Sequence, residues 1–150
     1  NISMKNLYLI FLLIFSIPPV FSQDITFVNS ELHLKNDAPF SEATIVNGVI
    51  YLSGEIGTLP NNRVIDGGIV PETIQALSNI KNKLERIGSS IDNVFKCTCM
   101  LSDIKDWPEM SKAYKTFFKK EKLPSRSAFA GSGLALNAKI EIECMATLIH

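Results

Sequence analysis

The chain has 150 residues, with 15 basic and 15 acidic side chains and a formal net charge of zero at neutral pH. This size suits one domain, and the zero balance argues against a nucleic-acid-binding protein, because such proteins usually carry a clear basic excess. Hydrophobic residues make up 46% and charged residues 20% of the chain, which excludes a wholly disordered protein, and three cysteines are too few for a disulfide scaffold.

The first 22 residues have the layout of a secretory signal peptide. Three residues that we interpret as an open-reading-frame remnant precede Met4, and Lys5, an uncharged apolar run over 7–17 and the small residue Ser22 follow. The run is too short for a transmembrane helix, which needs about 20 apolar residues. We expect cleavage after Ser22, export to the periplasm or the medium, and a mature domain over 23–150 without membrane contact. A membrane anchor that stays attached is the alternative.

The first part of the mature chain predicts short strands. They are 25–28, 31–34, 43–46 and 49–53. The third and fourth are separated by Asn47-Gly48, and an Asn-Gly pair between apolar runs is the strongest short-range signal of a β-hairpin. The segment 59–68 is rich in Pro, Asn, Asp and Gly and predicts a loop.

Residues 71–87 predict a helix. Its apolar residues recur at steps of three and four, and they are Ile74, Leu77, Ile80, Leu84 and Ile87. Pro71 suits the first turn, and Gly88 suits the C-terminal cap. A single apolar stripe with a polar back is typical of a helix that lies on a sheet.

The second half predicts a strand, a second helix and two further strands. They are 94–101, about 106–120, 127–130 and 139–148. Phe95, Cys97 and Cys99 share one face of the first of these strands, and Asp106 with Glu109 forms a capping-box pattern at the start of the helix. The order of elements predicts an α+β fold with one sheet and two helices on one face. Apolar residues on both sheet faces predict an oligomer.

The cysteines and histidines show no pattern of a metal site or a nucleophilic triad. Cys97 and Cys99 lie on the predicted core face, as does Cys144 on the last strand, so we interpret all three as small buried hydrophobic residues. His33 and His150 lack the spacing of metal ligands. No glycine-rich phosphate-binding motif is present in the sequence.

Three charged residues are candidates for chemistry. Arg126 lies at the entry to a predicted strand, and Glu141 and Glu143 alternate with isoleucines in the last strand. A guanidinium can clamp a carboxylate with two donors, and a carboxylate can accept a proton from water. On the pattern alone, Arg126 could equally neutralise one of the glutamates as a structural ion pair.

Six segments together resemble the RidA/YjgF family, the reactive-intermediate imine deaminases, over about residues 27–148. They are Pro39–Ala43, Ile50–Gly57, Asp103–Trp107, Tyr114–Phe118, Pro124–Ser127 and Lys139–Ala146. The resemblance implies a chorismate-mutase-like α+β fold with a single mixed sheet, and a homotrimer with its sites between subunits. It also implies hydrolysis of 2-imino acids or their enamines, of the 2-iminobutanoate and 2-iminopropanoate type, to 2-oxo acids and ammonia. No metal or organic cofactor is expected for this reaction.

The resemblance also implies roles for single residues. Arg126 would clamp the substrate carboxylate, Glu141 would position the attacking water, and the backbone N–H of Ala128 would add a contact to the carboxylate. The other positions that correspond to the family's substrate-binding pocket are Phe40, Ser53, Gly54 and Ser111. Phe40, Ser111 and Ala128 stand where tyrosine, asparagine and cysteine are common in the family, which leaves the choice of substrate open.

Two other functions stay open at this point. One is a trimer that binds small carboxylates without turning them over. The other is an RNA-cleaving or translation-inhibiting relative, although the neutral net charge and the lack of paired histidines count against RNA cleavage. Typical family members are cytosolic, so a cytoplasmic location is the alternative to export.

Overall fold

The computed structural model describes residues 24–149, so the predicted signal peptide lies outside the described residues. One sheet has the strand order β1-β2-β3-β7-β5-β6, and the short β4 also pairs with β7. The strands are β1 (Ile25–Val28), β2 (Ala43–Val46), β3 (Val49–Leu52), β4 (Glu55–Ile56), β5 (Val94–Leu101), β6 (Ser125–Ala130) and β7 (Ile140–Thr147). The α-helices are α2 (Glu31–Lys35), α3 (Ile69–Ile87) and α4 (Trp107–Lys115), with short 3₁₀ helices at η1 (Ile91–Asn93), η2 (Ile104–Asp106), η3 (Lys120–Lys122) and η4 (Ala135–Asn137). Within residues 24–149, no helix combines the length and the apolar character that a membrane span requires.

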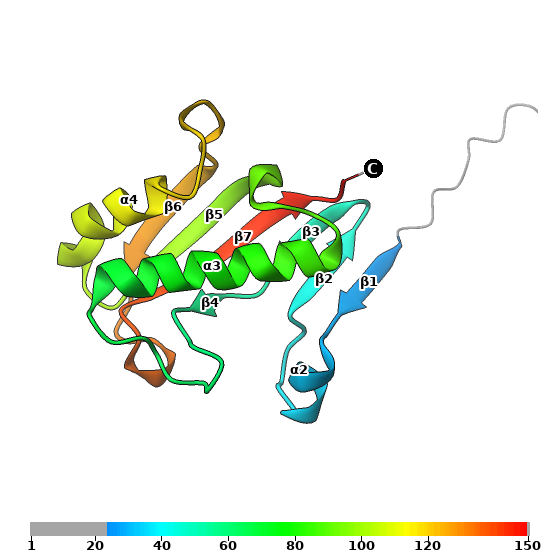
Figure 1. The fold of residues 1–150 in the computed structure, drawn as a ribbon, viewed down its shortest axis with the longest axis horizontal. Coiled ribbons are helices and arrows are strands. Elements are labelled where there is room, and N and C mark those ends of the chain that lie inside the picture. Colours follow the sequence, from blue (N-terminus) through cyan, green and yellow to red (C-terminus); the bar gives the residue numbers. More distant parts are fainter. Residues whose placement is uncertain (1–23, 150) are drawn as a thin grey trace, which may run out of the picture.

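The sheet is mixed, because β5 and β6 run parallel while the other paired strands are antiparallel. Helices α3 and α4 pack side by side on one face of the sheet (Figure 1). These features confirm the predicted α+β architecture of one mixed sheet with two helices on one face. Neither α3 nor α4 covers the opposite face, which we call the open face.

The hydrophobic core lies between the sheet and the two helices. Helix α3 buries Leu77, Ile80 and Leu84 completely, at the spacing that the sequence predicts. Ile74, also on the predicted stripe, is 41% exposed, and Thr73 is buried in its place. Gly88 follows the helix with a φ of 90°, in the left-handed region, so the predicted glycine cap is confirmed.

The predicted hairpin is confirmed by β2 and β3. Val46 and Val49 are register partners, and the two residues between them have φ angles of 49° at Asn47 and 78° at Gly48. A two-residue turn with positive φ at both positions matches the right-handed twist of the flanking strands. This turn sets the register that places Ser53 and Gly54 directly after β3.

The predicted strand over 31–34 is wrong, because these residues form helix α2. Ser30 caps this helix: its side chain accepts from the backbone N–H of His33, and its own N–H donates to Glu42 at 2.6 Å. Asn29 adds a bond from the backbone N–H of Glu42 at 3.0 Å. These side-chain bonds turn the chain away from the extended conformation, and Leu32 and Leu34 stay more than 60% exposed.

The elements of the second half differ from the prediction in their details. A β-bulge between Val94 and Lys96 buries Val94 and leaves Phe95 43% exposed, whereas a regular strand would turn Phe95 to the core. The predicted capping box does not form, because Asp106 ends η2 with helical backbone angles and makes no side-chain cap. Helix α4 ends at Lys115, before the predicted limit near 120, and β6 begins two residues before the predicted strand.

Two of the three cysteines form a disulfide. Cys97 and Cys144 are register partners on β5 and β7, and they pair across 47 residues of sequence. The predicted burial of all three is confirmed, but two of them are not simple hydrophobic residues, because Cys97 and Cys144 are joined through strand neighbours that are far apart in the chain. Cys99 is free and buried, and burial raises the pKa of its thiol to about 11.

Candidate active site

Arg126 lies on the edge strand β6 with its side chain against α4. Its guanidinium donates to Ser111 Oγ at 3.0 Å and approaches the Met110 sulfur at 3.7 Å. The ring centroids of Tyr114 and Trp107 lie 4.8 and 5.5 Å from the guanidinium carbon, within cation–π range. Within residues 24–149 no carboxylate forms an ion pair with Arg126. The alternative that Arg126 neutralises a glutamate therefore does not hold within this chain.

A cavity of about 250 Å³ opens beside this guanidinium. The described residues that line it include two cations and no carboxylate, and they are Trp107, Ser111, Tyr114, Lys115, Leu123, Pro124 and Arg126. Tyr114 is 3% exposed, and its hydroxyl finds no hydrogen-bond partner in the described part of the chain. Burial raises the pKa of Tyr114 above its ordinary value. Ala128 follows Arg126 by two residues, on the same face of β6.

Glu141 lies on β7 against the backbone that leads into β4. A Cβ atom on Gly54 would lie 2.0 Å from Glu141 Oε1, so only glycine leaves room for this carboxylate. Ser53 Oγ, one residue earlier, donates to the carbonyl of Ser41 at 2.7 Å. Phe40 precedes Ser41 and is 57% exposed. Four predicted site residues therefore lie around the segments that enter β2 and leave β3. They are Phe40, Ser53, Gly54 and Glu141.

Arg126 and Glu141 lie on opposite faces of the sheet. Arg126 is the register partner of Cys97, whose side chain is buried on the helix-covered face. Glu141 is the register partner of Met100 and alternates with buried isoleucines, so its side chain is on the open face. One chain thus holds two separate groups. We call them the Arg126 half-site (Ser111, Arg126 and Ala128) and the Glu141 half-site (Phe40, Ser53, Gly54 and Glu141).

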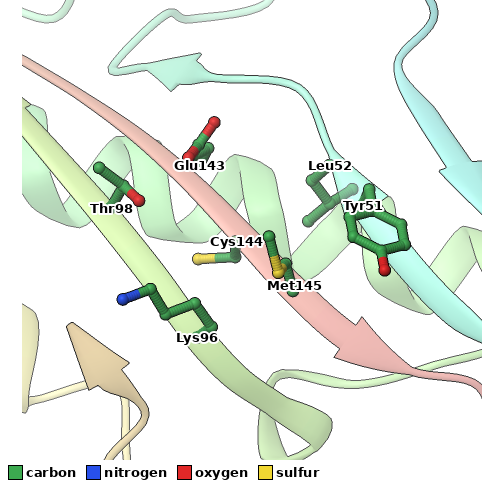
Figure 2. Close-up of a pocket in the computed structure, with 7 residues that line it drawn as sticks. All are labelled: Tyr51, Leu52, Lys96, Thr98, Glu143, Cys144 and Met145. Carbon is green, nitrogen blue, oxygen red and sulfur yellow. The ribbon is translucent and has the colours of Figure 1, made fainter. Parts of the chain in front are cut away.

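Glu143 also lies on the open face, two residues after Glu141. It lines a hollow of about 80 Å³ with Tyr51, Leu52, Lys96, Thr98, Cys144 and Met145 (Figure 2). This volume corresponds to only about three water molecules at about 30 Å³ each, so we assign no ligand to this hollow. Among residues 24–149, no group of three or more His, Cys, Asp or Glu side chains could hold a metal ion.

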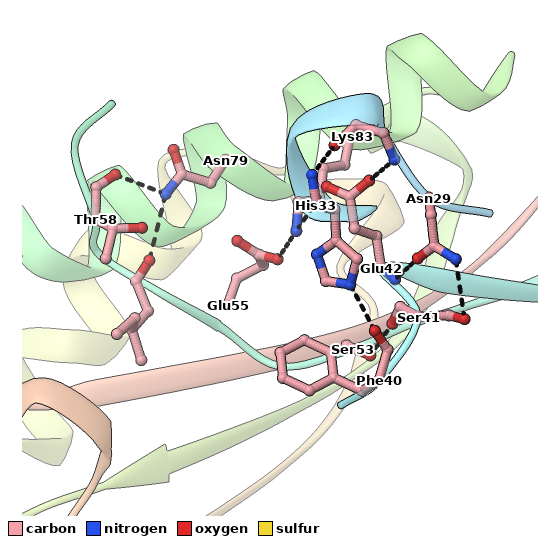
Figure 3. A network of polar contacts seen from close by, with 12 residues as sticks. Asn29, His33, Phe40, Ser41, Glu42, Ser53, Glu55, Thr58, Asn79 and Lys83 are labelled. Atoms are coloured by element: carbon pink, nitrogen blue, oxygen red, sulfur yellow. Dashed lines mark hydrogen bonds and ion pairs between the residues drawn. The ribbon is translucent and has the colours of Figure 1, made fainter. Parts of the chain in front are cut away.

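A buried charge network lies beside the Glu141 half-site, and the sequence analysis missed it (Figure 3). Lys83 on α3 forms an ion pair with Glu55 and lies 3.5 Å from Glu42 Oε1, and Arg86 donates to Glu42 at 2.8 Å. The two glutamates are only 5% and 9% exposed. We call these four residues the Glu55 network. One signal could have revealed it, since Glu42 and Glu55 adjoin apolar strands and such carboxylates need a nearby cation.

The two buried carboxyl groups are shifted in opposite directions. Burial raises the pKa of Glu55, and the nearby charges of Glu42 and Glu141 add to this, although Lys83 opposes it. Burial would also raise the pKa of Glu42. Hydrogen bonds from Arg86 and Ser30 and the charge of Lys83 outweigh burial there, so the pKa of Glu42 is lowered. The negative charge of Glu141 is thus one of the influences that raise the pKa of Glu55.

Comparison with known proteins gives consistent matches over this region. The family described as Endoribonuclease L-PSP matches residues 31–148. Protein HMF1 of Saccharomyces cerevisiae is 38% identical over 109 residues, which cover 73% of this chain and 84% of that protein. The human 2-iminobutanoate/2-iminopropanoate deaminase is 38% identical over 109 residues, which cover 72% of this chain and 79% of that protein. Among solved structures, that of YEO7_yeast has a TM-score of 0.75 at 32% identity and covers 84% of this chain and 100% of its own.

Proposed function

Because this chain belongs to the endoribonuclease L-PSP (YjgF/RidA) family, we propose that it hydrolyses 2-imino acids of the 2-iminobutanoate and 2-iminopropanoate type to 2-oxo acids and ammonia. The names of its human and mouse relatives support this reaction. The observation that carries the proposal is the Arg126 guanidinium. Neutral partners hold it beside a cavity, and no carboxylate pairs with it within the described residues, so its charge is available to an anionic substrate.

In the proposed reaction, Arg126 binds the substrate carboxylate through two parallel N–H donors, which fixes the imine carbon in place. Glu141 accepts a proton as water attacks that carbon and the carbon–oxygen bond forms. Glu141 passes this proton to the imine nitrogen, which gives a carbinolamine with a hydroxyl and an amino group. Glu141 then takes the hydroxyl proton and passes it to the nitrogen while the carbon–oxygen double bond forms and the carbon–nitrogen bond breaks, so the nitrogen leaves as ammonia. Water supplies the oxygen of the 2-oxo acid, so the atoms balance without a cofactor.

The two half-sites lie on opposite faces of one sheet, so we propose that they meet across the interface of a homotrimer. The open face offers apolar surface for assembly, since Tyr51 is 40% and Phe129 51% exposed there. Light scattering of the purified protein should give about three times the subunit mass. A stable monomer at micromolar concentration would contradict both the assembly and a site shared between subunits.

Substitutions of the two central residues test the proposed roles. Arg126→Ala should lower kcat/KM by roughly 30- to 5000-fold, and Arg126→Lys should not restore it, because a point charge lacks the planar fork. Glu141→Gln keeps the size of the side chain but cannot accept the proton, so turnover should fall while carboxylate binding survives. Glu143→Gln is the matched control on the same strand face and should cost much less activity. The measurements are hydrolysis of freshly generated 2-iminobutanoate and affinity for 2-oxobutanoate.

Two alternatives predict different results in the same experiments. A non-catalytic carboxylate-binding protein would show equal, background hydrolysis in wild type and Glu141→Gln, with binding lost only in the Arg126 variants. The description of the family also names an endoribonuclease, so RNA degradation by the same variants should be assayed. We expect none, because the net charge is zero and RNA binding depends on basic surface.

We also propose that the protein is exported and that its signal peptide is removed after Ser22. The disulfide between Cys97 and Cys144 supports this location, because disulfides persist in oxidising compartments and are rare in the cytosol. N-terminal sequencing of the exported protein from its native host should give a start at or near Gln23. A cytoplasmic product that still carries Met4 would contradict export.

A further inference from the structure

Three lysines in and just after α4 differ in their partners. Lys112 forms an ion pair with Glu109 at 2.7 Å, and Lys119 forms one with Asp92 at 2.5 Å. Lys115 lies between them in sequence, and no carboxylate pairs with it within residues 24–149. It is also the lysine that lines the cavity beside Arg126. Lys120 and Lys122, which follow in η3, also form no ion pair within residues 24–149, so Lys115 is distinguished by its place in the lining of the cavity.

The helix places Lys115 close to the guanidinium. Ser111, which accepts the hydrogen bond from Arg126 at 3.0 Å, lies four residues before Lys115 on α4. Residues four apart on a helix are neighbours on one face, with Cβ atoms about 5–6 Å apart. Two cations thus approach one cavity from two elements, Arg126 from β6 and Lys115 from α4.

The charges of this cavity are not balanced by the residues around it. Its described lining holds two cations, one serine hydroxyl, two aromatic rings, a leucine and a proline, and no carboxylate. Arg126 is proposed to bind the carboxylate next to the imine, which leaves Lys115, beside apolar walls, as the cation of this cavity that is available to a second carboxylate. The volume of about 250 Å³ corresponds to roughly eight water molecules at about 30 Å³ each, which is ample for a four- or five-carbon acid.

We propose that the Arg126 cavity selects 2-imino acids with a second carboxylate on the side chain, which Lys115 binds while Arg126 holds the carboxylate next to the imine. Lys115 is then a specificity-determining residue and no part of the chemical step. This inference rests on the deamination proposed above, because it assigns a substrate class to the same site. The aromatic and apolar walls contact the carbon chain between the two carboxylates.

Calorimetry with two stable five-carbon acids tests the inference. 2-Oxoglutarate carries the second carboxylate, and 2-oxopentanoate has the same chain length without it. Wild type should bind 2-oxoglutarate roughly fivefold more tightly, as expected for one partly exposed ion pair of about 1 kcal/mol. Lys115→Gln should remove that preference and leave 2-oxopentanoate binding unchanged, while Lys112→Gln, with the same change of charge one turn away, should preserve it.

Equal or weaker binding of 2-oxoglutarate by wild type, or no binding of either acid, overturns the inference. A Lys115→Gln variant that weakens both acids equally also overturns it, because this indicates general attraction of anions. Hydrolysis of 2-iminobutanoate is measured separately on wild type. Its absence would reject the deaminase, whereas a deaminase without preference for the second carboxylate would reject only the role of Lys115.

Discussion

The Arg126 half-site and the Glu141 half-site differ in the residues around their central charges, which are neutral in the first and charged in the second. Arg126 has a hydroxyl, a sulfur and two aromatic rings as neighbours, and its charge has no carboxylate partner in the described chain. Glu141 lies against the backbone of Gly54, beside two buried glutamates that are already paired with Lys83 and Arg86. The first surrounding leaves a fixed charge free for a ligand, and the second holds a carboxylate against a backbone position where only glycine leaves room.

In the proposed mechanism, substrate binding and proton transfer therefore belong to different faces of this fold. Under this proposal each subunit carries two incomplete halves, and damage to one half should leave the other usable. Variants that damage one half, mix the two halves or weaken the strands that join them test this separation.

Mixing two inactive variants should restore activity, which is the largest effect we expect. Arg126→Ala retains its Glu141 half-site and Glu141→Gln retains its Arg126 half-site. After unfolding and joint refolding of equal amounts, three quarters of the trimers are mixed and each contains one complete site of three, or about a quarter of wild-type activity. Imine hydrolysis by the co-refolded mixture is the measurement.

Co-refolding of Arg126→Ala with Arg126→Lys is the control and should restore nothing, because no intact Arg126 half-site is present. Failure of both mixtures, with trimers confirmed by light scattering, would show that each site is contained within one subunit. That outcome would remove the comparison between two separable halves.

Gly54→Ala should disable the Glu141 half-site alone. The added Cβ would lie 2.0 Å from Glu141 Oε1, so the carboxylate must move, and a displacement of about 1 Å can lower activity on the order of 100-fold. Affinity for 2-oxobutanoate should change little, because Arg126 is untouched. Gly133→Ala is the matched control, since nothing lies within 4 Å of its added Cβ. Wild-type turnover in Gly54→Ala would show that the observed position of Glu141 is not needed.

The disulfide joins β5, which neighbours the strand of Arg126, to β7, which carries Glu141. Its loss in Cys97→Ala/Cys144→Ala should lower the free energy of unfolding by about 2–4 kcal/mol, as expected for a cross-link of a loop of this length. Thermal unfolding with and without reductant is the measurement. Wild type and Cys99→Ala should both lose stability on reduction, and the double variant should not respond. A wild type insensitive to reductant would mean that the two thiols are not paired.

The Glu55 network should give the smallest effect, a dependence of stability on pH. Because the pKa of Glu55 is raised above 4.5, the folded protein holds its proton more tightly than the unfolded chain does, so stability falls as pH rises from about 4.5 through the folded pKa. Glu55→Gln should remove that fall. The pKa of Glu42 is lowered, so its contribution is present above 4.5 and is lost as pH falls through the folded pKa.

Glu42→Gln is therefore the control of opposite sign and should flatten only the acid side of the curve. Urea unfolding between pH 3 and 8 measures both. If the two variants change the same pH range, the two carboxyl groups do not titrate as separate members of the network.

Local signals in the sequence were enough to predict most elements. The Asn47-Gly48 pair and the spacing of Leu77, Ile80 and Leu84 each depend on neighbours within one or two turns of chain, and the structure confirms them. The segment 31–34 was mispredicted although Ser30 is a local N-cap that accepts from the backbone N–H of His33, and the bond from the Ser30 N–H to Glu42, twelve residues away, could not be read from local sequence. Contacts between distant segments leave little trace in local periodicity.

The candidate site also combines features that local sequence predicts with features that depend on contacts between distant segments. The residue types and spacing, together with the family resemblance, identified Arg126 and Glu141 without showing that they lie on opposite faces. That result needs the register of β6 and β7 against β5, which no short stretch of sequence encodes. The Glu55 network was missed for the same reason, because its ion pairs link α3 to segments 28 and 44 residues away.

The pairing of Cys97 with Cys144 bears on how the chain is synthesised. Cys99 follows Cys97 by two residues and precedes Cys144 by 45, so in the exported protein that we propose, Cys97 and Cys99 are the first thiols to reach an oxidising compartment. Any bond formed between them must be exchanged for the native one once β7 is available, by attack of a thiolate on a disulfide sulfur. In the folded domain Cys99 is buried with a pKa of about 11, so this exchange has to finish before the sheet closes over it. For the proposed exported protein, formation of the native disulfide would therefore depend on the order in which the thiols are delivered and then buried.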